Sequence, residues 1–162
     1  MEKGVYNPER AFIKDLETFF SGREESWKWQ AGLFQQIKDL GPDEALWKSS
    51  EERHCIWEIV RHVNYWKSYV IAKINNQEVP NPETGSWPVI KFGEKENDWQ
   101  DEIHRTELLH NTYVKTVNNN LKILFEIEEG YGALLRQLIY HDAYHAGQIG
   151  ILRVMQGLKP IE

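Results

Sequence analysis

The sequence predicts an all-α protein, a four-helix bundle with a long loop between its second and third helices. Apolar residues recur at steps of three and four along most of the chain, which is the period of an amphipathic helix. No alternation of strand and helix patterns interrupts them, so a layered α/β architecture is not expected. With 162 residues the chain suits one domain, and we expect residues 1–162 to fold as a single bundle.

The first predicted helix begins after Asn7, a suitable N-cap because its side chain can accept a hydrogen bond from a free backbone N–H group. After a break at residues 21–22 the helical pattern resumes over residues 24–40, where a Gly-Pro pair ends it. A short segment over residues 42–50 leads to the second helix.

The second predicted helix starts at a capping box formed by Ser49 and Glu52 and extends to Ile74. Its inward stripe follows helical spacing and contains Ile59, Val63, Trp66, Val70 and Ile74. The loop over residues 76–95 follows, with three prolines and two glycines. Because long loops often carry function, we expect Trp87 to lie near a substrate.

The third predicted helix spans residues 97–121, a turn follows at 124–130, and the last helix spans residues 131–156. Gly157 and Pro160 give this last helix a conventional end. One side of the third helix carries Trp99, Ile103, Thr106, His110, Tyr113, Val117 and Leu121.

Composition excludes several classes of protein. The net charge of −6 argues against nucleic acid or an anionic membrane surface as the main partner. The only cysteine, Cys55, cannot form an intrachain disulfide, and this favours a reducing compartment. We expect Cys55 itself to be a small buried hydrophobe. No apolar run reaches the length of a membrane span, and the N-terminal segment lacks the core of a signal peptide. We expect a cytoplasmic protein.

His141 and His145 share one face of the last helix, because residues four apart are neighbours on a helix surface. Their stripe also contains Leu134, Leu138, Ile149 and Leu152, so both imidazoles should point into the bundle. His62 lies mid-helix between Ile59 and Trp66 and is the best candidate for a third ligand. Three histidines with one open position are typical of catalytic zinc sites.

Two other interpretations compete for this pair. Each histidine could satisfy itself with a buried hydrogen bond, and HxxxH alone is a weak signal. The metalloprotease motif HExxH is excluded, because Asp142 follows the first histidine where that chemistry requires glutamate.

The segments "IWEIVRHVNYW" and "HDAYHAGQIGILR" together resemble the DinB/YfiT-like family of four-helix-bundle proteins. The matching positions are His62 on the second helix and His141 and His145 on the last, with Gln148 after them. The resemblance implies a divalent metal ion, Zn or Ni, in a bundle that often forms a homodimer. It also implies a metal-dependent S-transferase that joins a low-molecular-weight thiol to an electrophile, or a hydrolase of a small molecule.

A ferritin-like di-iron site is a further possibility, because Glu51 with His54 and Glu107 with His110 have the required Glu-x-x-His spacing. His110 could instead be a fourth ligand or a pocket base, while His104 should face solvent.

The remaining polar residues leave alternatives open. Asp142 and Tyr144 either support the ligands or lie at a surface. Arg136 and Arg153 either attract an acidic substrate or pair with carboxylates. For the whole protein, a metal-binding stress or interaction protein without turnover and a bundle without metal remain alternatives to the enzyme.

Overall fold

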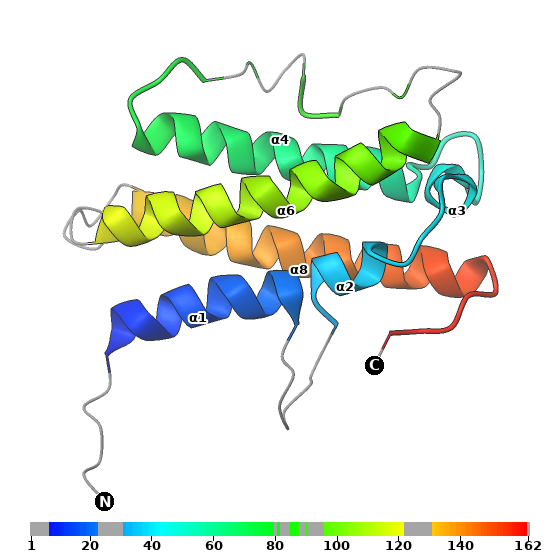
Figure 1. The fold of residues 1–162 in the computed structure, drawn as a ribbon, viewed down its shortest axis with the longest axis horizontal. Coiled ribbons are helices and arrows are strands. Elements are labelled where there is room, and N and C mark those ends of the chain that lie inside the picture. Colours follow the sequence, from blue (N-terminus) through cyan, green and yellow to red (C-terminus); the bar gives the residue numbers. More distant parts are fainter. Residues whose placement is uncertain are drawn as a thin grey trace, which may run out of the picture.

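The computed structural model describes residues 7–22, 31–79, 81, 85–87, 90, 96–121 and 131–161. All regular structure in these segments is helical, so the predicted all-α class is confirmed for them. None of these helices is both long and apolar enough to span a lipid bilayer. The helices are α1 (Pro8–Ser21), α2 (Leu33–Ile37), α3 (Pro42–Leu46), α4 (Ile56–Ile74), α6 (Glu96–Asn119) and α8 (Tyr131–Met155) (Figure 1).

Helix α4 packs against both α6 and α8, and α1 and α2 follow one another along α8 (Figure 1). Helix α8 runs opposite to α4, whereas α4 and α6 run in the same direction (Figure 1). The chain between α4 and α6 must therefore return along the length of the bundle. This requirement explains the length of the predicted 76–95 loop, of which residues 76–79, 81, 85–87 and 90 are described.

The break predicted after α1 is confirmed, whereas of the helix predicted over residues 24–40 the described part is helical only in α2, Leu33–Ile37. Gly22 ends α1 with φ +79°, and residues 31–32 are not helical. A Cβ atom at Gly32 would collide with the backbone of Phe20 and Gly22, so the chain packs tightly on the end of α1 here. The remainder of that prediction, residues 24–30, lies outside the described residues.

The predicted capping box at Ser49 and Glu52 is also wrong. Helix α4 begins at Ile56, and the carboxylate of Glu58 accepts a hydrogen bond from the Cys55 N–H at 2.9 Å. Lys48 donates to the other carboxylate oxygen of Glu58 at 2.9 Å and so holds it in place. The same cap chemistry is present, but it uses a glutamate six residues further along the chain.

The other boundaries agree closely with expectation. Asn7 caps α1 by accepting from the Arg10 N–H at 2.9 Å. Helix α6 ends two residues before the predicted limit and α8 one residue before it, with Gly157 at φ +80° beyond. The turn predicted at 124–130 lies outside the described residues.

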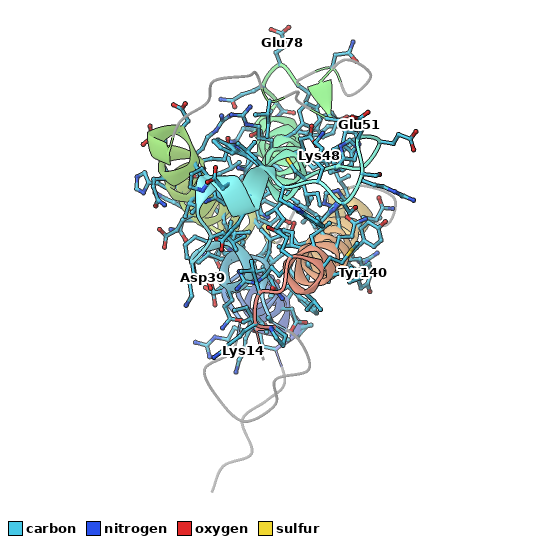
Figure 2. All side chains as sticks on the ribbon, turned by 90° about the vertical axis from the view of Figure 1, so that its right-hand side faces the viewer. Lys14, Asp39, Lys48, Glu51, Glu78 and Tyr140 are labelled. Carbon is cyan, nitrogen blue, oxygen red and sulfur yellow. The ribbon has the colours of Figure 1, made fainter. Side chains whose placement is uncertain are left out.

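The core forms where the inward stripes of the helices meet. The predicted stripe of α6 is buried from Trp99 to Val117, and the indole N–H of Trp99 donates to the Leu40 carbonyl at 2.7 Å. On α4, Ile59, Val63 and Val70 are buried. Figure 2, which looks along the bundle, shows the labelled Lys14, Glu51 and Glu78 projecting outward.

One ion pair lies entirely inside the bundle, between α4 and α8. Lys67 is 0% exposed and donates from Nζ to the Asp142 carboxylate at 2.5 Å. Burial raises the pKa of Asp142, and the Lys67 ammonium opposes that rise. Removing one member of such a pair strands the other in the core, at a cost of about 3–5 kcal/mol. The pair therefore constrains how α8 packs against α4.

Candidate metal centre

Three imidazoles converge between α4 and α8, as the sequence predicted. The Nε2 atom of His141 lies 3.1 Å from His62 Nε2 and 3.1 Å from His145 Nε2. Within the described segments this is the one group of three or more His, Cys, Asp or Glu side chains whose ligand atoms lie close enough to share an ion, all within 4.8 Å. Metal–nitrogen bonds near 2.0–2.1 Å at tetrahedral angles would separate such nitrogens by about 3.3 Å.

The ring orientation of His62 is fixed by the segment that crosses over α4. Its Nδ1 lies within hydrogen-bond distance of the Ser86 carbonyl oxygen. A carbonyl oxygen can only accept, so Nδ1 carries the proton and Nε2 presents its lone pair to the cluster. The indole of Trp87 stacks on the same ring, with centroids 3.7 Å apart, and covers one of its faces.

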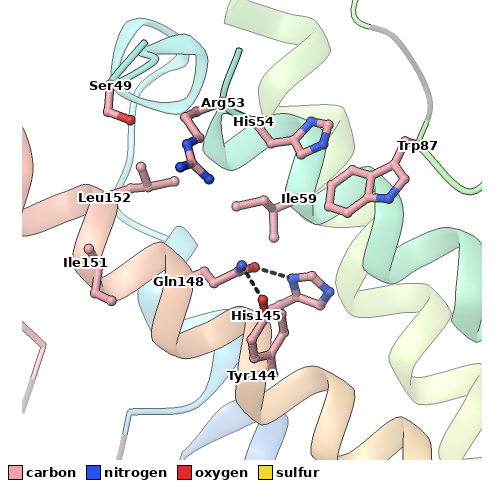
Figure 3. A pocket seen from close by; sticks show the side chains of 10 residues that line it. All are labelled: Ser49, Arg53, His54, Ile59, Trp87, Tyr144, His145, Gln148, Ile151 and Leu152. Atoms are coloured by element: carbon pink, nitrogen blue, oxygen red, sulfur yellow. Dashed lines mark hydrogen bonds between the residues drawn. The ribbon is translucent and has the colours of Figure 1, made fainter. Parts of the chain in front are cut away.

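His145 is oriented in the same way by a side chain one turn further along α8. Its Nδ1 lies 2.7 Å from Gln148 Oε1, while Gln148 Nε2 donates to the Tyr144 hydroxyl at 2.9 Å (Figure 3). Because the amide nitrogen is used toward Tyr144, the amide oxygen faces the histidine and accepts its Nδ1 proton. The Nε2 lone pair of His145 is therefore also directed at the cluster.

The contacts of His141 cannot all be hydrogen bonds between neutral rings. Its Nε2 faces two nitrogens that both present lone pairs, yet a neutral imidazole can donate only one hydrogen there. At least one of the two 3.1 Å contacts is therefore left without a bridging proton. A divalent cation would accept all three lone pairs, so the donor set fits a metal ion.

All three imidazoles favour the neutral form that ligation requires. Burial lowers the pKa of His62, although the Ser86 carbonyl opposes the effect. Burial, reinforced by the neighbouring histidines, lowers the pKa of His141 to about 3. Burial lowers the pKa of His145 to about 4 despite the hydrogen bond to Gln148. Protons therefore compete weakly with a metal ion at neutral pH.

A cavity of about 320 Å³ opens beside His145 (Figure 3). Trp87 forms part of its wall and is 38% exposed. The full lining comprises Ser49, Arg53, His54, Ile59, Trp87, Tyr144, His145, Gln148, Ile151 and Leu152.

The carboxylate–histidine pairs of the di-iron hypothesis do not come together among the described residues. Glu51, His54 and Glu107 are exposed, and His54 stacks on Trp87 at 3.8 Å. His110 is only 3% exposed but stacks on Phe20 at 3.7 Å and does not join the cluster, so the alternative of a fourth ligand does not hold. His104 is exposed, as predicted.

Other polar residues have structural roles. Asp142 neither supports a ligand nor lies at a surface, because it pairs with Lys67. Arg153 is buried and makes a two-pronged contact with Asp39, at 2.8 and 2.9 Å, while Arg136 is exposed. Cys55 is buried, and burial raises the pKa of its thiol to about 11, so it is no nucleophile at neutral pH.

Sequence analysis did not identify Lys67, Arg53 or the Ser86 carbonyl. Lys67 had a readable signal, because it lies four residues after Val63 and three before Val70, within the inward stripe of α4. Arg53 and Ser86 had none, since only the folded chain brings them to the cavity and to His62.

In the part of the chain that the structure describes, the fold is helical throughout its regular structure and brings three histidines close enough to hold a metal ion. Comparison with protein-family models, with curated proteins and with solved structures gave no significant match. The functional inference therefore depends on the site.

We predict that His110 makes the protein lose stability in acid. Burial lowers its pKa to about 2, below the value of about 6.5 expected in the unfolded chain. The unfolded state therefore binds the proton first. The contribution of neutral His110 to the free energy of unfolding is complete above about pH 6.5. Below that pH it falls by about 1.4 kcal/mol per pH unit. In urea unfolding of the chelator-treated protein between pH 6 and pH 4, His110→Leu should give a shallower pH dependence than the parent chain.

Asn111→Leu, an exposed and non-titrating position on the same helix, is the control and should keep the slope of the parent. Parallel pH profiles for His110→Leu and the parent chain would contradict the prediction.

Proposed function

We propose that this protein is a metal-dependent enzyme of the DinB/YfiT-like class, with a four-helix bundle that holds Zn or Ni on His62, His141 and His145. One observation carries the proposal: three Nε2 lone pairs converge, and two of them are fixed because the opposite ring nitrogen donates its proton elsewhere. Ligands oriented in this way are typical of metal sites. Three imidazoles accept Zn, Ni, Cu or Fe, so the choice of Zn or Ni rests on the resemblance.

The proposed reaction joins a small thiol to an electrophile. A bound divalent ion lowers the pKa of a thiol or of water and so supplies a nucleophile at neutral pH. In the transfer, the S–H proton passes to solvent, an S–C bond forms, and the leaving group departs with its electron pair. The protein's own contribution is to hold His145 through Gln148 and to cover His62 with Trp87.

Two alternatives use the same site. A hydrolase would direct activated water at a small substrate, with the same lowering of pKa at the metal. A metal-binding stress or interaction protein would hold the ion without turnover. Metal binding is common to all three, and turnover distinguishes the two enzymes from the non-catalytic protein.

We predict about one equivalent of Zn or Ni in protein purified without a histidine tag. His141→Ala should abolish binding, because it removes the imidazole that faces both others. Gln148→Ala should weaken binding by about 10- to 100-fold, because it frees the Nδ1 proton of His145. Elemental analysis and competition against a chromophoric chelator measure these effects.

Gln137→Ala, an exposed position on the same helix, is the matched control and should bind metal like the parent chain. Protein that purifies without metal, and whose melting temperature ignores both chelator and added Zn, would rule out the metal hypotheses.

We predict turnover only in the metal-loaded protein. A panel of low-molecular-weight thiols with a model electrophile, and a panel of esters and amides, should separate transferase from hydrolase. With the same panels, the metal-depleted protein and the His141→Ala variant should show only the background reaction rate. Stoichiometric metal without any accelerated reaction would favour the non-catalytic alternative.

We also propose that the protein forms a homodimer through an exposed face of α8. The side chains of Tyr140, Tyr144, Ile151 and Val154 are each more than half exposed and follow helical steps on one face. The intervening Gly147 has open space around it, where another helix could approach closely. Such exposed apolar faces commonly mark interfaces.

Light scattering should therefore give twice the 19.2 kDa mass of the chain. Val154→Glu should shift the mass toward the monomer, because it places a charge in the apolar face, whereas Asn111→Glu, at an exposed position on α6, should not. A monomeric mass for the parent chain at every concentration would refute the dimer.

A further inference from the structure

The cavity beside His145 has one wall of apolar side chains and, among its polar lining groups, one guanidinium. Ile59 and Leu152 are 3% and 8% exposed and form its inner surface, while Ile151 and the indole of Trp87 lie nearer solvent. Figure 3 shows the guanidinium of Arg53 pointing into the space between these side chains. The volume of the cavity, about 320 Å³, is at the lower end of the range for ligand pockets, roughly 300–1,000 Å³.

Arg53 is not committed to a partner elsewhere in the described part of the chain. Its backbone N–H donates to Ser50, but no described carboxylate pairs with its side chain. The two other guanidinium groups near the core differ, since Arg61 pairs with Glu102 and Arg153 with Asp39. A cation that faces a cavity without a counter-ion can bind an anion there.

The electrostatics of the cavity point the same way. Among the described residues no aspartate or glutamate lines it, although the chain as a whole carries a net charge of −6. Arg53 precedes the N-terminus of α4, where the helix dipole also favours negative charge. Glu58, in the first turn of α4, is occupied by Lys48, by the Cys55 N–H and by His54 at 3.5 Å, while Glu51 and Glu52 are exposed.

We propose that this cavity binds a small organic monoanion, with its carboxylate on Arg53 and its apolar body against Ile59, Leu152 and Trp87. Its opposite end would reach the ion held at His145, so the proposal rests on the proposed metal site for that end alone. The apolar side chains of Ile59, Leu152 and Trp87 favour an apolar body at that wall, because polar groups placed against them would lose water without gaining partners. The substrate class is therefore a carboxylic acid of modest size with an aliphatic or aromatic middle.

The test uses pairs of probes that differ only at the end facing Arg53. The full-length protein loaded with Co²⁺ is titrated with ω-mercaptocarboxylates of increasing chain length and with ω-mercaptoalcohols of the same lengths. Thiolate ligation is followed through the sulfur-to-cobalt charge-transfer absorption. At the chain length that spans the cavity, the acid should bind about three- to tenfold more tightly than the alcohol, as expected for a partly exposed charged pair.

Arg53→Met keeps most of the side-chain length and removes the charge, so it should erase this preference while Co²⁺ stoichiometry stays at that of the parent chain. Arg136→Met, an exposed arginine on α8, is the control and should keep the preference. Equal binding of acid and alcohol by the parent chain would overturn the proposal, and so would a preference that survives Arg53→Met.

A second measurement separates this proposal from the metal site. Heptanoate and heptanol contain no thiol, and their binding to metal-free protein can be compared by ligand-observed NMR. If the protein does not bind Co²⁺ but prefers heptanoate to heptanol, and if Arg53→Met removes this preference, the anion site would be supported and the metal centre rejected. Normal Co²⁺ binding with no carboxylate preference in either assay would reject the anion site alone.

Discussion

The buried ion pair between Lys67 and Asp142 joins the two helices that carry the three histidines. Lys67 lies five residues after His62 on α4, and Asp142 directly follows His141 on α8. Sliding α8 by one turn along α4 would leave an ammonium and a carboxylate in the core without each other, which costs several kcal/mol. The pair thus selects the one register in which His62 faces the HxxxH turn. The geometry of the cluster follows from this core contact.

A second constraint acts on protons. His62 and His145 each donate their Nδ1 proton to an oxygen that can only accept it, so their Nε2 lone pairs are committed before any ligand arrives. Burial keeps the rings of His141 and His145 neutral. His141 completes a group of three ring nitrogens, and no arrangement of protons on neutral rings places a hydrogen in both of the 3.1 Å contacts between them. The folding energy of the bundle holds these lone pairs together, so the site is preorganised for a cation.

Much of this architecture could be predicted because it is written in local periodicity. The inward faces of α6 and α8, the Asn7 cap and the three histidines all follow from spacing along single helices. Features set by tertiary contacts were missed. The predicted start of α4 was wrong because Glu52 and Glu58 are both suitable capping residues when judged from the local sequence. Lys48 holds Glu58 in the capping position only in the folded chain. Lys67 escaped notice because a lysine is ordinarily assigned to the surface, whereas here a carboxylate from another helix neutralises it.

The contact that orients His62 uses the main-chain carbonyl of Ser86, and this choice affects how the site can diversify. Every amino acid offers the same carbonyl oxygen, so the side chain at position 86 can vary without loss of the hydrogen bond, provided that the backbone keeps its path. The next residue, Trp87, contributes its side chain to the cavity wall. The crossing segment therefore divides two roles between neighbouring positions: the backbone of Ser86 orients His62, whereas the side chain of Trp87 covers that ring and shapes the cavity. Selection could change what the cavity accepts while the ligand beneath it stays in place.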